Sequence, residues 1–99
     1  MRLHIYNGLE NEKVPKDVTH VIVDNSVTVI RVTAFYECEH LVCLIMGDNV
    51  KRIEAYAFFY CIALLYIQLS KILEYIGQYA FLNCRSLEAV FLPSTVKSI

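Results

Sequence analysis

Three side chains in the middle of the chain have the types and spacing of a metal site. Cys38, His40 and Cys43 form a C-x-H-x-x-C cluster, and thiolate and imidazole are common ligands in structural zinc sites. Such a site takes four convergent ligands, and the sequence offers no fourth ligand with this cluster. Cys38 also belongs to a regular column of cysteines, which predicts a packing role. We therefore expect no metal and no cofactor.

Motifs that carry catalysis are absent from the sequence. It contains no G-x-S-x-G, no Walker loop, no H-E-x-x-H and no G-x-G-x-x-G. The histidines, at positions 4, 20 and 40, are scattered, and none is paired with a nucleophile in sequence. We expect no catalytic residue and no enzymatic activity.

Composition excludes several classes of protein and partner. The 99 residues are 57% hydrophobic and 19% charged, which indicates one folded domain instead of a disordered segment. A net charge of -1 offers little to a phosphate backbone, so we expect no nucleic-acid partner. The N-terminus lacks a signal-peptide pattern and no N-x-Ser/Thr site occurs, so we expect an intracellular location with free thiols.

An uncharged run of fifteen residues, 55–69, raises the question of a membrane segment. As a helix it would span about 22 Å, which is short of the roughly 30 Å hydrocarbon core. The repeat described next assigns much of the run to core columns. We therefore expect no membrane insertion.

The chain repeats itself every 23 residues. Aligned at this offset without a gap, nine columns of matched character appear, and one of them contains isoleucine in four registers. The columns include Ala34, Ala57 and Ala80; Phe35, Phe58 and Phe81; Cys38, Cys61 and Cys84; Leu41, Leu64 and Leu87; and Ile30, Ile53, Ile76 and Ile99.

Each repeat predicts a short strand, a turn, a second extended piece and a compact turn. The L-x-x-L-x-L part alternates at period two, which is typical of a strand. The A-F-x-x-C spacing fits one helical or 3₁₀ turn that carries Phe and Cys inward. One such turn cannot bury its apolar column alone, so stacked copies must cover each other. The expected fold is a mainly β solenoid with short parallel strands at Thr19–Val23, Cys43–Met46, Tyr66–Leu69 and Ala89–Leu92.

The pattern V-x-x-I-G-x-x-A-F-x-x-C-x-x-L-x-x-V-x-L-P resembles the BspA-like class of leucine-rich repeats. The best-matching stretch is LEYIGQYAFLNCRSLEAVFLPSTVKSI, and the resemblance covers residues 18–99. The motif's glycine survives only as Gly77 and its proline only as Pro93. The resemblance implies short strands on a concave face, helical or 3₁₀ turns on the opposite side, and a protein-interaction scaffold without shared catalytic residues.

The register divides the chain into two parts. Residues 1–16 lie outside the pattern and are expected to form an irregular or hairpin-like N-terminal cover. Residues 17–99 form the expected solenoid. It consists of a half-repeat (18–26), three repeats (27–49, 50–72 and 73–95) and a partial repeat (96–99).

The candidate binding surface is the concave strand face, which points away from the core. Alternation along each strand places two side chains per turn there, and several are apolar or aromatic. Exposed apolar stripes mark interaction sites, but the N-terminal segment or a second copy could instead cover this one. The candidate partner-binding residues are His20, Ile22, Cys43, Ile45, Tyr66, Gln68, Ala89 and Phe91.

Two functional hypotheses remain open at this stage. The first is a non-enzymatic protein-protein interaction scaffold with an unidentified protein partner. The alternative is a structural or assembly segment of a longer repeat array, which includes the case of a truncated fragment. The sequence stops at the fourth member of the isoleucine column, so nothing polar follows to cover Phe81 or Leu87. We therefore also expect self-association through this uncapped C-terminal end.

Overall fold

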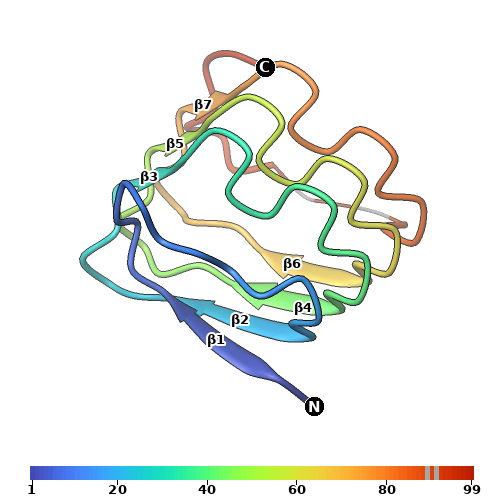
Figure 1. Ribbon diagram of the computed structural model, residues 1–99. Helices are drawn as coiled ribbons and strands as arrows, with labels where there is room; N and C mark the ends of the chain where they lie inside the picture. Colours follow the sequence, from blue (N-terminus) through green and yellow to red (C-terminus); the bar gives the residue numbers. More distant parts are fainter. Residues whose placement is uncertain (89, 91) are drawn as a thin grey trace.

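The chain winds into a solenoid of stacked turns in the computed structural model, which describes residues 1–88, 90 and 92–99 (Figure 1). Successive full turns add one short strand to each of two sheets, and all described strand pairs are parallel. The four-stranded sheet has the order β1-β2-β4-β6, with β1 (Leu3–Tyr6), β2 (His20–Val23), β4 (Cys43–Ile45) and β6 (Tyr66–Gln68). The three-stranded sheet has the order β3-β5-β7, with β3 (Val29–Ile30), β5 (Arg52–Ile53) and β7 (Tyr75–Ile76).

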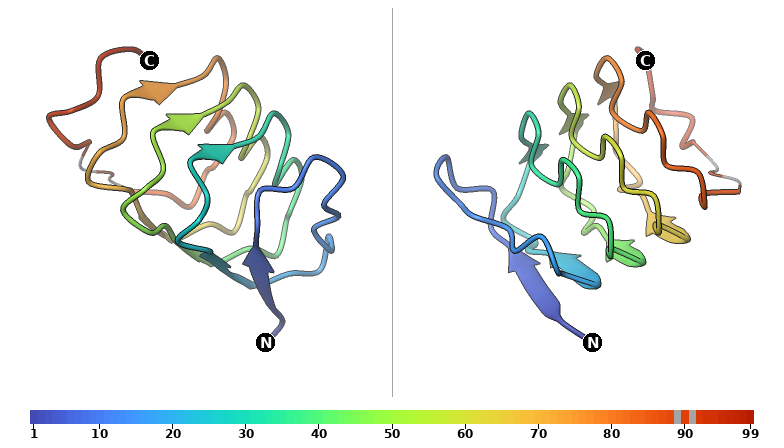
Figure 2. Two further views of the ribbon diagram at one scale, coloured as in Figure 1. Left: turned by 90° about the vertical axis from the view of Figure 1, so that its left-hand side faces the viewer. Right: turned by 45° about the vertical axis from the view of Figure 1, so that its right-hand side comes forward.

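The pairing between strands follows the 23-residue spacing of the sequence. His20 lies opposite Cys43, and Cys43 lies opposite Tyr66. In the second sheet Ile30 lies opposite Ile53. Equivalent residues of successive repeats are therefore direct neighbours, as the two views of Figure 2 show for the strands that carry them.

Three of the four expected concave-face strands lie where the alternation placed them, as β2, β4 and β6. Each is one residue shorter than expected. The fourth, expected at Ala89–Leu92, includes residues 89 and 91, which lie outside the described residues.

The core consists of columns that run along the solenoid axis. Phe58 is fully buried and stacks on Phe35 and Phe81, with ring centroids 5.2 Å and 5.1 Å apart and ring planes within 6° of parallel. Cys38 and Cys61 are also fully buried. Burial of a large apolar side chain contributes about 1.5–3 kcal/mol, and here each copy supplies the cover for the next.

The connection that carries the A-F-x-x-C motif is not the expected helical or 3₁₀ turn. The Ala34 N–H bonds three residues back to Arg31 at 3.1 Å, but the Phe35 N–H bonds Ala57 of the next solenoid turn at 2.7 Å. A helix needs each N–H to bond within its own segment. Thr33 has a φ of 58° at the third position of the Arg31–Ala34 turn, where a type II turn needs a positive value. The connection is a series of β-turns, and the described part of the chain contains no helix.

Left-handed backbone recurs at the same two places in every repeat. Six residues other than glycine have φ between 56° and 64°. Non-glycine residues adopt this region at a cost, so the stacking of the turns holds them there. They are Thr33, Tyr56 and Tyr79 in one column and Glu37, Tyr60 and Asn83 in the other.

The N-terminal segment, expected to form an irregular or hairpin-like cover over residues 1–16, contains a regular strand. Strand β1 extends the four-stranded sheet, with Leu3 opposite His20. The chain then returns across the end of the solenoid, where the Tyr6 ring packs 5.0 Å from the Phe35 ring. These residues form a shortened additional turn. The 23-residue offset does not detect it because β1 precedes its partner by seventeen residues.

The apolar run of residues 55–69 is divided between the β-turn connection and β6. Among the described residues, no helix has the length and apolar character that a membrane crossing requires.

Candidate functional site

The four-stranded sheet presents two rows of side chains to solvent, which we call the strand face. Along each strand, alternate residues point into the core, as fully buried Leu44 does between its neighbours in β4. Parallel pairing in register brings the outward residues of adjacent strands together. The first row is Leu3, His20, Cys43 and Tyr66, and the second row is Ile5, Ile22, Ile45 and Gln68.

The strand face is apolar and accessible. Ile22 is 45% exposed and Tyr66 is 51% exposed, values that are high for large apolar side chains. His20, Cys43 and Ile45 are half-buried. The two rows contain no acidic side chain, lysine or arginine. Such a surface can bind by removal of apolar area from water.

The polar groups of the strand face lie near its borders. The His20 Nδ1 is 2.9 Å from the Thr19 hydroxyl oxygen. The Gln68 amide donates a hydrogen bond of 3.5 Å to the Met46 carbonyl, and the Gln68 side chain remains exposed. These groups can orient a bound partner, while the tyrosine ring adds an amphipathic contact.

The structure brings six of the eight sequence-predicted residues into these rows: His20, Ile22, Cys43, Ile45, Tyr66 and Gln68. The other two, Ala89 and Phe91, lie outside the described residues. Sequence reasoning missed Leu3 and Ile5, which are 49% and 42% exposed. The apolar-polar alternation of Leu-His-Ile-Tyr was the signal that could have identified β1 as a strand.

The N-terminal segment does not lie over the strand face. It pairs with β2 edge to edge, so its own outward side chains lengthen both rows. The expectation that this segment could cover the stripe is therefore wrong for β1.

The cysteines have structural surroundings that differ from one another. Burial raises the pKa of the Cys38 thiol. The neighbouring Cys84 thiol, and then burial, raise the pKa of the Cys61 thiol as well. Both thiols are thus held protonated at neutral pH, which makes them poor nucleophiles and poor metal ligands. Cys43 differs because it lies half-buried on the strand face.

The C-x-H-x-x-C cluster is spread over two environments. Cys38 points into the core, His40 is exposed in the connection, and Cys43 belongs to the strand face. Over residues 1–88, 90 and 92–99, no three His, Cys, Asp or Glu side chains are grouped as metal ligands would be.

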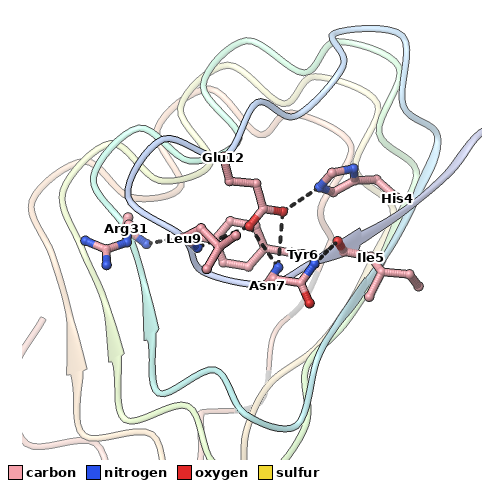
Figure 3. Close-up of polar contacts among 7 residues, drawn as sticks. All are labelled: His4, Ile5, Tyr6, Asn7, Leu9, Glu12 and Arg31. Atoms are coloured by element: carbon pink, nitrogen blue, oxygen red, sulfur yellow. Dashed lines mark hydrogen bonds and ion pairs between the residues drawn. The ribbon is translucent and has the colours of Figure 1, made fainter.

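A polar network closes the N-terminal end of the solenoid (Figure 3). The Glu12 carboxylate is only 8% exposed and lies 2.7 Å from the His4 Nε2. Its oxygens also accept the backbone N–H groups of Asn7, at 2.9 and 3.1 Å, and of Leu9, at 3.2 Å. The carboxylate is therefore fully engaged in holding the loop.

The fold and the strand face define a repeat scaffold built from parallel strands that are joined by β-turns. The chain belongs to the BspA-type leucine-rich repeat family, whose repeat region matches residues 14–99. None of the curated proteins is significantly similar to it in sequence.

Two solved structures share the architecture. The T. pallidum leucine-rich repeat protein TpLRR is 28% identical with a TM-score of 0.75, over 78% of this chain and 38% of that one. A leucine-rich repeat protein from Bacteroides ovatus ATCC 8483 is 21% identical with a TM-score of 0.67, over 96% of this chain and 26% of that one. The second likeness concerns the fold alone. The chain spans between a quarter and two fifths of the length of these relatives.

Proposed function

We propose that this chain is a non-enzymatic scaffold that binds another protein through the strand face. The observation that carries the proposal is a run of exposed apolar side chains across adjacent strands. Leu3, Ile5, Ile22 and Tyr66 are each between 42% and 51% exposed. Contiguous apolar surface of this kind is typical of protein-interaction sites.

The rigidity of the sheet supports the same proposal. The inner strands β2 and β4 are hydrogen-bonded on both sides, so the side chains that they present are already ordered. Less conformational entropy is then lost when a partner binds. A fixed array of side chains favours binding of a specific partner over nonspecific association.

The chemistry of the two rows restricts the partner. Aliphatic groups and one tyrosine dominate, with a histidine and a glutamine as the polar members. We infer a partner with an apolar segment that also offers a few hydrogen-bonding groups, because unpaired charges would be costly to bury against these rows.

A pull-down with face-specific variants tests this function. Ile22→Asp and Tyr66→Asp place a charge in each row, and we expect both to abolish capture of the partner while the fold is retained. Tyr79→Asp is the matched control, because Tyr79 is 50% exposed against 51% for Tyr66 but lies on the turn side. Capture that survives both strand-face variants, with unchanged circular dichroism, would refute the proposal.

An assembly role is the second candidate, and a separate observation favours it. Cys84 and Leu87 are only partly buried, whereas their counterparts Cys61 and Leu64 are fully buried. This end of the solenoid therefore offers apolar area that a further turn or another copy would cover. Leu92, 45% exposed, is the residue to change. Assembly predicts self-association that Leu92→Asp abolishes and that Tyr66→Asp leaves intact.

A further inference from the structure

The outer edge of the four-stranded sheet is β1, and its hydrogen-bonding groups are unused on one side. The Arg2 and Tyr6 carbonyls accept N–H groups from the β2 side, at 2.9–3.1 Å and 2.9 Å. Because backbone groups alternate sides along a strand, those of Leu3 and Ile5 point away from the sheet. Among the described residues, the only partner of these groups is the Asn7 amide, 3.3 Å from the Ile5 carbonyl.

This edge lacks the usual protection against pairing. The strand reads Leu-His-Ile-Tyr, with no proline and no lysine, and it is as long as β2. The neighbouring edge of the three-stranded sheet is closed instead. There the Arg31 N–H donates to the Tyr6 hydroxyl at 3.1 Å, and the Arg31 side chain donates to the Gly8 carbonyl at 2.7 Å.

We propose that β1 is a self-association edge that pairs antiparallel with β1 of a second copy. A two-fold axis at His4 would place Leu3 of each copy opposite Ile5 of the other copy. Both residues direct their free backbone groups at the partner, so this register forms hydrogen-bonded pairs. The two four-stranded sheets then become one continuous sheet.

Side chains favour a second copy over an unrelated strand. Leu3 of each copy forms an aliphatic cross-strand pair with Ile5 of the other, and both strand faces become one longer surface. Charge does not oppose the pairing, because Arg2, at the amino end of β1, already forms an ion pair of 2.7 Å with Asp17 within one copy.

Sedimentation velocity over a concentration series tests the pairing. We expect a dimer for the wild-type chain. The dissociation constant of the dimer should rise at least about tenfold for Leu3→Pro, which removes an outward N–H, and for Ile5→Lys. Ile22→Lys is the matched control, since Ile22 has a similar exposure but lies on an inner strand. We expect it to leave the dimer unchanged. Thermal unfolding establishes that each variant is folded.

Hydrogen exchange provides a second readout that does not depend on substitutions. The Leu3 and Ile5 N–H groups should exchange more slowly at high protein concentration than at low concentration. A wild-type chain that stays monomeric at high micromolar concentration would overturn the proposal. A dimer that resists Leu3→Pro and Ile5→Lys, or one that Ile22→Lys dissociates, would overturn it equally. A dimer that Ile22→Lys dissociates would place the second copy on the strand face and would also count against the proposed function, whereas the other results do not bear on that function.

Discussion

The Cys61 thiol donates a hydrogen bond of 3.1 Å to the carbonyl of Phe35, one solenoid turn away. The Phe35 carbonyl oxygen also accepts the N–H of Cys38 at 3.1 Å, so the thiol bonds to the second lone pair of that oxygen. Cys84 repeats the contact with Phe58 at 3.0 Å. The cysteine column thus links successive turns through thiols that pack as small apolar groups and also donate to a carbonyl.

Alkaline pH should destabilise the fold through these thiols. The pKa of Cys61 and the pKa of Cys38 are raised above the ordinary value of 9.0. The folded state therefore retains these protons at pH values where the unfolded state has lost them. The stability that these thiols contribute is fully present below about pH 9 and falls as pH rises above it, with a limiting slope of about 1.4 kcal/mol per pH unit for a thiol that is protonated only in the folded state.

Urea unfolding at pH 7, 9 and 10 measures this dependence. Cys61→Ala serves as the comparison, because it removes one titrating group and should flatten the decline above pH 9. Equal slopes for the two proteins would show that Cys61 does not contribute.

Thiol labelling should separate Cys43 from the two fully buried cysteines. Cys43, on the strand face, should react with iodoacetamide in the folded protein, whereas buried Cys38 and Cys61 should react only after unfolding. Mass spectrometry of peptides locates the label, and labelling in denaturant provides the reference for complete reaction. Rapid modification of Cys61 under native conditions would be inconsistent with this core.

Truncation of a side chain in the phenylalanine column should destabilise the folded state. Phe58→Ala should lower the free energy of unfolding by about 3–5 kcal/mol, since Phe58 is fully buried between two stacked rings. Phe59→Ala, at a half-buried position on the turn side, should cost clearly less. Urea denaturation of both variants gives the comparison, and a similar loss for both would contradict the assignment of the core.

Glycine should be favourable at the left-handed positions. Thr33→Gly should raise the free energy of unfolding by about 0.5–1 kcal/mol, because threonine pays for a φ of 58° and glycine does not. Thr28→Gly is the control at an exposed position without positive φ, and it should destabilise. Stabilisation by both substitutions, or by neither, would argue against strain at Thr33.

The sequence was informative wherever a side chain recurs at 23 residues. The columns of Phe58 and Cys61 and the strands with Leu44 and Ile67 follow from that period because stacked copies must bury identical residues. The conformation of the connection did not follow. The A-F-x-x-C spacing suits a helical turn and a series of β-turns alike, and Tyr56 gives no composition signal for positive φ.

The candidate site was predicted in part for a related reason. Ile22 and Tyr66 follow from alternation along strands within the repeat. Leu3 and Ile5 escaped detection because β1 is offset by seventeen residues and its inward position carries His4, not an aliphatic residue. The role of these residues in binding stays a prediction.

Site-specific photocrosslinking tests the strand face as the binding surface most directly. A photoreactive phenylalanine analogue would replace Tyr66 in one protein and Tyr79 in another, two tyrosines of nearly equal exposure on different sides of the solenoid. After irradiation with cell extract, we expect a discrete crosslinked partner from position 66 and none from position 79. Adducts from position 79 alone, or the same adducts from both positions, would contradict the proposed function.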